Sequence, residues 1–168
     1  QASADALAQA QTLWNAGSQA AAIDLMQQTV DAAERAVKAG SSPVGNPVLL
    51  SQVRELTRMQ MALGRYGPVW ETLSSLEPVL GNAPDLWGLR GNTAQRLGRH
   101  ADSVRAYTAA LQSRPNEQRW MLGAAVSMAA LGQTDQAAAM AEKAHDVGEI
   151  SREVQTYLHQ MGVPLKAR

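Results

Sequence analysis

Arginine is the residue type with the clearest chemical potential in this 168-residue chain. Residues 51–119 contain nine arginines, no lysine and six acidic residues, a local balance of +3 in a chain whose formal net charge is zero. A guanidinium group can donate two parallel hydrogen bonds to a carboxylate, so arginine is well suited to recognising acidic groups. Arg54 and Arg58 are four residues apart and would share one face of a helix. The middle of the chain therefore predicts a surface that binds acidic groups.

The residue types needed for catalysis do not form a recognisable constellation. His100, His145 and His159 are dispersed and lack the His-Glu-x-x-His spacing that holds zinc. The absence of cysteine excludes a thiol nucleophile, disulfides and cysteine-based zinc sites. Neither a nucleophile-elbow motif nor a phosphate-binding Gly-x-x-x-x-Gly-Lys loop occurs. We therefore expect no enzymatic activity, no metal and no cofactor.

The elements that would carry the arginines repeat with a period of 34 residues. Leu63-Gly64-Arg65, Leu97-Gly98-Arg99 and Leu131-Gly132-Gln133 each close a stretch of helical character, and a second such stretch follows each of them. A period of this length indicates helix–turn–helix units that stack on one another. Glycine suits the end of the first helix, because it tolerates the left-handed conformation found there. The sequence therefore predicts an all-α chain of nine helices without strands.

The unit at 84–117 carries the most specific pattern. Six of its residues stand where a tetratricopeptide repeat (TPR) has Trp, Gly, Gly, an aromatic residue, Ala and Pro: Trp87, Gly91, Gly98, Tyr107, Ala110 and Pro115. Gly91 would let the paired helix approach closely, and Pro115 would stop the second helix. Close helix packing therefore explains the glycines of this unit better than phosphate binding does. The whole chain resembles the TPR family.

This resemblance implies an α-solenoid, a right-handed superhelix in which the first helix of each unit lines a concave groove. We expect one domain over 1–168 with units at about 3–46, 50–83, 84–117 and 118–150, and a C-terminal capping helix at 151–161. The first unit exceeds the period by 13 residues. We assign this surplus to a second helix prolonged through Lys38 and to a loop from Gly40 to Gly45. Asn46 would then cap the next helix, with Pro47 in its first turn.

The capping helix should be amphipathic. Its apolar residues recur at spacings of three and four, which places Val154, Tyr157, Leu158 and Met161 on one face. We expect this face to cover the core that the last repeat would otherwise expose, as the ends of solenoids require.

The groove positions implied by the resemblance hold residues that could bind a partner. They are Arg54 and Arg58 in the second unit, Asn92, Gln95 and Arg96 in the third, Arg119 at the start of the fourth, and Trp14 near the end of the first helix. We predict a polar, arginine-lined groove that receives an acidic segment of a protein, with Trp14 as an aromatic anchor. A second interpretation stays open, in which the arginines are solvated or paired with Glu55 or Asp85 and Trp14 serves packing. The chain does not match the Hsp90-type carboxylate clamp.

A narrower likeness covers residues 84–165. The segment from Arg114 to Gly123, the Leu131-Gly132 pair and the closing Tyr157-Leu158 pair are similar to the C-terminal region of MshN-type proteins of MSHA-pilus biogenesis. This resemblance implies a periplasmic TPR domain that serves assembly of a type IV pilus or secretion system. It also implies an inner-membrane anchor in a segment not present here.

Together these patterns predict a non-catalytic scaffold for protein–protein interaction. The alternative is a self-associating adaptor that uses its outer faces and the long helix from Ser18 to Lys38. We expect no nucleic-acid partner, because a dense basic stripe with exposed aromatic residues is missing. We also expect no membrane contact by this segment, because the longest stretch of apolar and small residues, Met121 to Gly132, is well short of the ~20 residues of a membrane helix. A cytoplasmic location stays the alternative to the periplasm.

Overall fold

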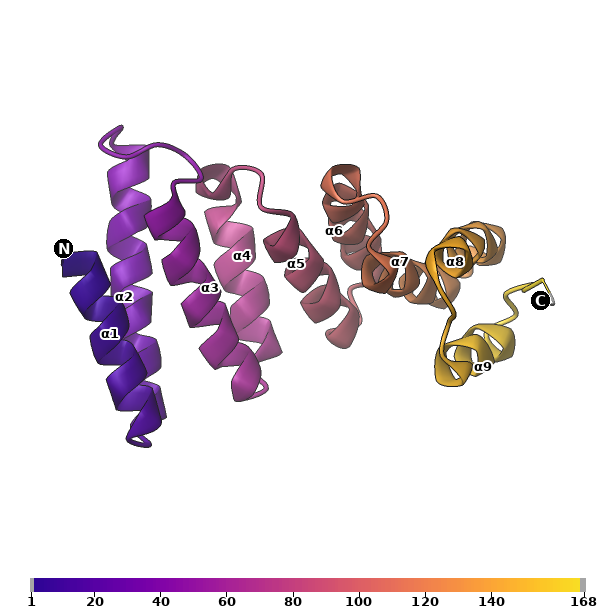
Figure 1. Ribbon diagram of the computed structural model, residues 1–168, viewed down its shortest axis with the longest axis horizontal. Coiled ribbons are helices and arrows are strands. Elements are labelled where there is room, and N and C mark those ends of the chain that lie inside the picture. The colour runs from indigo at the N-terminus through magenta and orange to yellow at the C-terminus, as the bar shows by residue number, and fades with distance from the viewer. Residues whose placement is uncertain (1, 167–168) are drawn as a thin grey trace. The chain divides into compact units, whose positions relative to one another are not determined.

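The computed structural model describes residues 2–166, and within this range the chain forms nine α-helices and no strand (Figure 1). The predicted fold class, an all-α solenoid of helix–turn–helix units, is confirmed. The helices are α1 (Ala2–Asn15), α2 (Gln19–Lys38), α3 (Pro47–Ala62), α4 (Tyr66–Leu80), α5 (Pro84–Arg96), α6 (His100–Ser113), α7 (Gln118–Ala130), α8 (Thr134–Val147) and α9 (Arg152–Gln160). Over residues 2–166, no helix is both long and apolar enough to cross a membrane.

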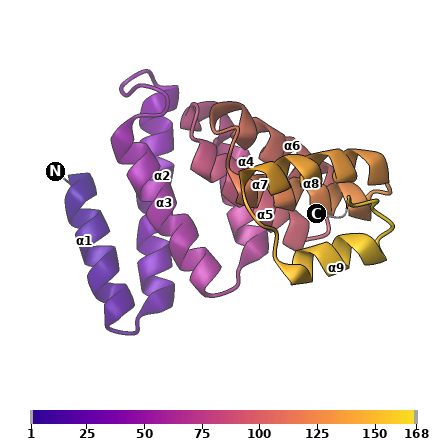
Figure 2. The same cartoon turned by 45° about the vertical axis from the view of Figure 1, so that its right-hand side comes forward.

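The helices group into two compact units, residues 1–83 and 84–168. In the first unit, α1 packs on α2, α2 on α3 and α3 on α4. In the second, α5 packs on α6, α6 on α7 and α7 on α8, and α9 lies against α7 (Figure 2). Because α5 also contacts α7, the first helices of two successive repeats are neighbours in this unit. The predicted repeat boundaries, and the expectation of one domain, stay predictions.

The turn glycines explain the 34-residue period. Gly64, Gly98 and Gly132 follow α3, α5 and α7, and their φ angles are +69°, +76° and +78°. A residue with a Cβ pays about 1–2 kcal/mol in this left-handed conformation, whereas glycine does not. The same tight turn therefore recurs wherever a first helix gives way to a second.

The 13 surplus residues of the first repeat, predicted at about 3–46, lie where the sequence places them. Helix α2 continues to Lys38, and α3 begins at Pro47 after a loop. The side chain of Asn46 caps α3, since its Oδ1 accepts a hydrogen bond of 2.9 Å from the backbone N–H of Leu49. The prolonged helix and the Asn-Pro restart are both confirmed.

Small side chains build much of the core of the second unit. Ala110, Ala124 and Ala137 have no exposed surface and belong to the same buried cluster as Trp120, which is 5% exposed. Alanines at these positions let helix backbones approach closely, because their side chains are small.

The capping helix only partly fulfils its expectation. Ser151 caps it, and Leu158 is fully buried against the core of the second unit. Tyr157 and Met161, however, are 36% and 37% exposed, so their predicted role in covering the core is wrong. The segment after α9 takes over that role, because Val163 is buried in the same cluster.

Candidate protein-binding site

The residues predicted to bind a partner fall into both compact units. Trp14, Arg54 and Arg58 belong to the first compact unit, residues 1–83. Asn92, Gln95, Arg96 and Arg119 belong to the second. Each group has its own local geometry.

In the first unit, the structure brings Trp14 and Arg58 together. The guanidinium carbon of Arg58 lies 5.5 Å from the centre of the half-buried Trp14 ring, so α1 and α3 meet through a cation–π contact. Arg58 Nε also donates a hydrogen bond of 3.0 Å to Oε1 of Glu55. That hydrogen bond raises the pKa of Arg58 above its ordinary value. Arg54 is exposed one turn earlier on the same helix.

Arg58 makes both contacts, with Glu55 and with Trp14, inside the protein itself. The Glu55 pair matches the interpretation of partly paired arginines, and the Trp14 contact places the aromatic ring and the cation at one surface position. An acidic group of a partner would therefore compete with Glu55 for Arg58. Arg119 also pairs with an acid, Glu117, but through Nε alone and with a side chain that is 77% exposed, against 52% for Arg58. We therefore regard the first group as the weaker of the two candidate contacts.

In the second unit, Gln95 joins two repeats. Its Nε2 group on α5 donates hydrogen bonds of 2.8 Å to the carbonyl oxygen of Gly123 and 2.9 Å to Oγ of Ser127, both on α7. These bonds use both N–H donors of the amide. The structure thus gives Gln95 a positioning task, since it holds the first helices of neighbouring repeats at a fixed spacing.

The ring of Tyr107 lies between two glycines. A Cβ added at Gly91 would come within 2.8 Å of the Tyr107 ring at Cγ, and one at Gly123 within 2.4 Å at Cζ. Tyr107 is only 4% exposed, as expected of a core residue. The ring therefore passes from α6 between α5 and α7, through a slot that exists because both neighbouring positions lack a side chain.

The hydroxyl group of Tyr107 lies near three of the predicted groove residues. The side chain of Asn92 forms a hydrogen bond with it, and Arg96 and Arg119 are near enough to influence its ionisation. Arg96 Nε in turn donates a hydrogen bond of 3.0 Å to Oδ1 of Asn92. We call Asn92, Arg96, Tyr107 and Arg119 the Tyr107 cluster.

Burial keeps the Tyr107 hydroxyl protonated. Desolvation raises its pKa above the ordinary value, and this effect outweighs the opposing effects of the Asn92 hydrogen bond and of the charges on Arg96 and Arg119. The cluster is therefore cationic at neutral pH, because it combines two guanidinium groups with a neutral phenol. Arg119, whose side chain is 77% exposed, also pairs with Glu117 through an Nε–Oε1 contact of 3.2 Å.

The sequence pattern places Tyr107 at the aromatic position of the repeat and does not connect its hydroxyl with the arginines. A signal for the connection was present, because Gly91 and Gly123 lie nearly one repeat apart on successive first helices with an aromatic residue between them. Gly88 follows the same logic, since a Cβ there would come within 2.3 Å of Nε1 of Trp120. Close packing is thus confirmed as the role of Gly88 and Gly91.

One serine–histidine pair could suggest a nucleophile. Nδ1 of His100 lies 3.1 Å from Oγ of Ser127. Ser127, however, has no exposed surface, and Gln95 occupies its hydroxyl with a further hydrogen bond. The pair therefore belongs to the network that joins α5 and α7, because no substrate can reach the hydroxyl.

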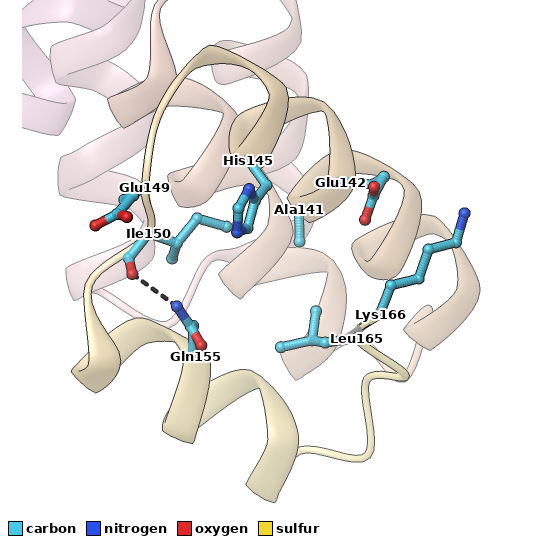
Figure 3. A pocket seen from close by; sticks show the side chains of 8 residues that line it. All are labelled: Ala141, Glu142, His145, Glu149, Ile150, Gln155, Leu165 and Lys166. Carbon is cyan, nitrogen blue, oxygen red and sulfur yellow. Dashed lines mark hydrogen bonds between the residues drawn. The ribbon is translucent and has the colours of Figure 1, made fainter. Parts of the chain in front are cut away.

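A cavity of about 400 Å³ lies beside the capping helix (Figure 3). Its walls come from α8, α9 and the segments around them, and the lining residues are Ala141, Glu142, His145, Glu149, Ile150, Gln155, Leu165 and Lys166. The amide of Gln155 fixes one wall through a hydrogen bond of 2.7 Å from Nε2 to the carbonyl oxygen of Ile150. Among the residues that the structure describes, no three His, Cys, Asp or Glu side chains are placed to hold a metal ion, here or elsewhere.

Comparison with solved structures gives a match to the fold, whereas comparison with family models and curated proteins gives no match. No protein-family model and no curated protein matched the sequence. Among solved structures, the chain is similar to the crystal structure of TTC0263, a thermophilic TPR protein in Thermus thermophilus. The TM-score is 0.55 at 18% sequence identity, and the match covers 95% of this chain and 80% of that chain. The likeness supports the TPR fold that the repeats predict.

Proposed function

We propose that this chain, whose helices are arranged as in a TPR protein, is a non-catalytic scaffold that binds an acidic segment of a partner protein. The observation that carries this proposal is the Tyr107 cluster. It brings Asn92 and Arg96 of α5 and Arg119 of α7 together with the phenol that α6 sends between these two helices. The TPR-like fold supports a protein as the partner.

The chemistry of the cluster favours a carboxylate. Hydrogen bonds from guanidinium groups to carboxylates are charge-assisted and roughly twice as strong as neutral ones. Gln95 holds α5 and α7 together, so Arg96 and Arg119 project from a fixed base. Such preorganisation lowers the entropic cost of binding.

The finer assignment we propose is an assembly factor for a type IV, MSHA-like pilus or for a secretion system, acting in the periplasm. Its support is the likeness of the segment from Arg114 to Gly123 and of the Tyr157-Leu158 pair to MshN-type proteins. If it is correct, the genes beside the coding sequence encode pilus or secretion components, and fractionation recovers the full-length protein with the periplasm or inner membrane. Recovery from the cytoplasm would contradict it.

Neutralising the cluster should weaken binding of acidic peptides. We expect the double variant Arg96→Gln with Arg119→Gln to bind a fluorescein-labelled, glutamate-rich peptide at least about tenfold more weakly than the unmodified chain. The loss should follow from two missing charge-assisted contacts. Fluorescence anisotropy at about 50 mM and about 300 mM NaCl measures it, and salt should weaken only the unmodified chain's binding strongly.

The control removes the same charge elsewhere in the unit. Arg105→Gln with Arg152→Gln changes two exposed arginines outside the cluster and should leave affinity within about twofold. A glutamine-rich peptide of equal length should bind neither protein. Equal losses from both double variants would reduce the effect to net charge, and no loss from either would refute the acidic-segment proposal.

The first unit offers a parallel test. We expect Arg54→Ala with Arg58→Ala to weaken the same peptide by less than the cluster variant does, because Glu55 already occupies Arg58. Helicity measured by circular dichroism should stay unchanged. A larger loss here than in the second unit would move the main contact to α3.

A further inference from the structure

The start of α7 carries Arg119 but has no side-chain cap of its own. In α3 and α9, the side chains of Asn46 and Ser151 accept hydrogen bonds from the first turn. Glu117, the residue before α7, makes no such bond in the part of the chain that the structure describes, and its carboxylate pairs with Arg119 instead. The first N–H groups of a helix have no partner within it, so an uncapped end tends to fray. The position of Arg119 therefore depends on contacts that other helices make with this turn.

Gln118, the first residue of α7, makes such a contact with the end of α8. Its Nε2 atom lies 3.0 Å from the carbonyl oxygen of Ala144, 2.9 Å from that of Gly148 and 3.2 Å from that of Glu149. An amide nitrogen has two hydrogens, so the three acceptors share them. The acceptors belong to the last turn of α8 and to the linker at 148–151 that leads to α9. Gln118 therefore connects the start of α7 to this linker.

The linker at 148–151 is held from α9 as well. Nε2 of Gln155 on α9 donates a hydrogen bond of 2.7 Å to the carbonyl oxygen of Ile150 (Figure 3). The side chain of Ile150 is 7% exposed and belongs to one buried cluster with Met121 of α7. Three successive carbonyl groups, those of residues 148, 149 and 150, thus accept hydrogen bonds from two glutamines on different helices. The linker is therefore a fixed support for the start of α7.

Trp120 holds the same turn of α7 on another side. Its ring is 5% exposed and lies in the core of the second compact unit. Successive side chains of an α-helix point about 100° apart, so Gln118 and Trp120 hold the helix in two different directions, with Arg119 between them in sequence. Two such contacts fix the rotation of the turn about its axis, which one contact would not. The side chain of Arg119 therefore leaves α7 in a defined direction, near the Tyr107 hydroxyl.

We propose that Gln118 is a positioning residue of the acidic-segment site, because it holds Arg119 in the Tyr107 cluster before a partner binds. This role rests on the proposed function and deepens it, since it names the internal contact on which the affinity of that site depends. The amide of Gln118 is used within the protein, so Gln118 does not itself bind the partner. Without this contact, the partner would have to order Arg119 and its helical turn, which costs affinity.

Gln118→Met tests the role of the amide. Methionine has a similar length and helix propensity but cannot donate to the three carbonyl oxygens. We expect the variant to bind the glutamate-rich peptide about three- to tenfold more weakly at low salt, as measured by fluorescence anisotropy. The dependence of affinity on salt should stay that of the unmodified chain, because both guanidinium groups still reach the peptide. Arg119→Gln should lower the affinity and its salt dependence together, since it removes a charged contact.

Gln155→Met is the matched control. It makes the same substitution at the other glutamine that holds the linker, and it removes the hydrogen bond to Ile150 without changing α7. We expect it to loosen α9 but to leave affinity for the peptide within about twofold. Hydrogen exchange of the full chain locates the two effects. The backbone N–H of Trp120, which bonds to the carbonyl oxygen of Glu117, should exchange faster in Gln118→Met and at the unmodified rate in Gln155→Met.

Three results would overturn the role of Gln118 and leave the acidic-segment site intact. One is unchanged affinity in Gln118→Met. Another is an equal loss in Gln118→Met and Gln155→Met, which would assign the loss to general loosening of the second compact unit. The third is a salt dependence lowered as far as in Arg119→Gln, which would mean that Arg119 no longer reaches the peptide at all. Failure of the unmodified chain to bind the peptide would instead refute the proposed function, and the role of Gln118 with it.

Discussion

Gly123→Ala is expected to lower the free energy of unfolding of the second unit by about 2–3 kcal/mol, because the new methyl group has no room. Its Cβ would lie 2.4 Å from Cζ and 2.6 Å from Cε2 of Tyr107. The ring has little room to withdraw, since Gly91 lies on its other side, where even an added Cβ would come within 2.8 Å of Cγ. Urea unfolding of the full chain followed by circular dichroism measures the loss.

Gly67→Ala is the matched control. This glycine lies in α4, does not have a positive φ, and has nothing within 4 Å of the position of an added Cβ. Alanine should therefore stabilise the helix by up to about 1 kcal/mol. Combining Gly123→Ala with Tyr107→Leu should restore part of the loss, because leucine is shorter than tyrosine. Equal effects of Gly123→Ala and Gly67→Ala would contradict the slot around Tyr107.

The displaced ring would also affect binding. Gly123→Ala should weaken the glutamate-rich peptide, since the Tyr107 hydroxyl and the Gln95 bond to the carbonyl of residue 123 both belong to the same region. A variant that is destabilised yet binds normally would separate the slot from the cluster.

Gln52→Met is expected to have the second-largest effect on stability, in the opposite direction. Gln52 is 2% exposed in α3, and in the part of the chain that the structure describes neither its Nε2 nor its Oε1 has a hydrogen-bond partner. Burying an unpaired amide costs about 1–3 kcal/mol. Methionine has a similar length without the amide, so the first unit should gain about 1–2 kcal/mol. Urea unfolding again provides the measurement.

Gln60→Met provides the comparison on the same helix. Gln60 is 3% exposed, but its Nε2 donates a hydrogen bond of 3.4 Å to Oγ1 of Thr72. Methionine would remove that bond and leave the buried hydroxyl of Thr72 with one partner fewer, so we expect little gain or a loss. If Gln52→Met is the more destabilising of the two, the amide of Gln52 must be satisfied in solution.

The sequence predicted the helices well because their signals are local. A glycine with a positive φ follows each first helix, and an Asn-Pro pair starts α3, so both are determined by a few neighbouring residues. The capping helix was harder to predict. Helical spacing placed Tyr157 and Met161 on the apolar face, but the segment after α9 supplied Val163 in their place. Spacing alone does not show which of two apolar segments will reach the core.

The candidate sites depended far more on tertiary contacts. The groove positions implied by the repeat pattern included Arg96, Arg119 and Gln95, whereas the role of Gln95 as a link between α5 and α7 required two helices to be packed. The hydroxyl of Tyr107 joined them only because Gly91 and Gly123 leave a slot. A hollow of about 620 Å³ in the first compact unit likewise arises from residues on α1, α2, α3 and the loop between α2 and α3, which no sequence period connects.

By itself, then, the sequence determined the repeat, the turns and the supply of arginines, since these follow from backbone conformation and from the chemistry of single residues. Tertiary structure alone decided which polar groups are consumed within the protein and which surfaces are hollow. The physical reason is that hydrogen bonding and exclusion of volume depend on distances between segments, and the packing of the helices sets those distances.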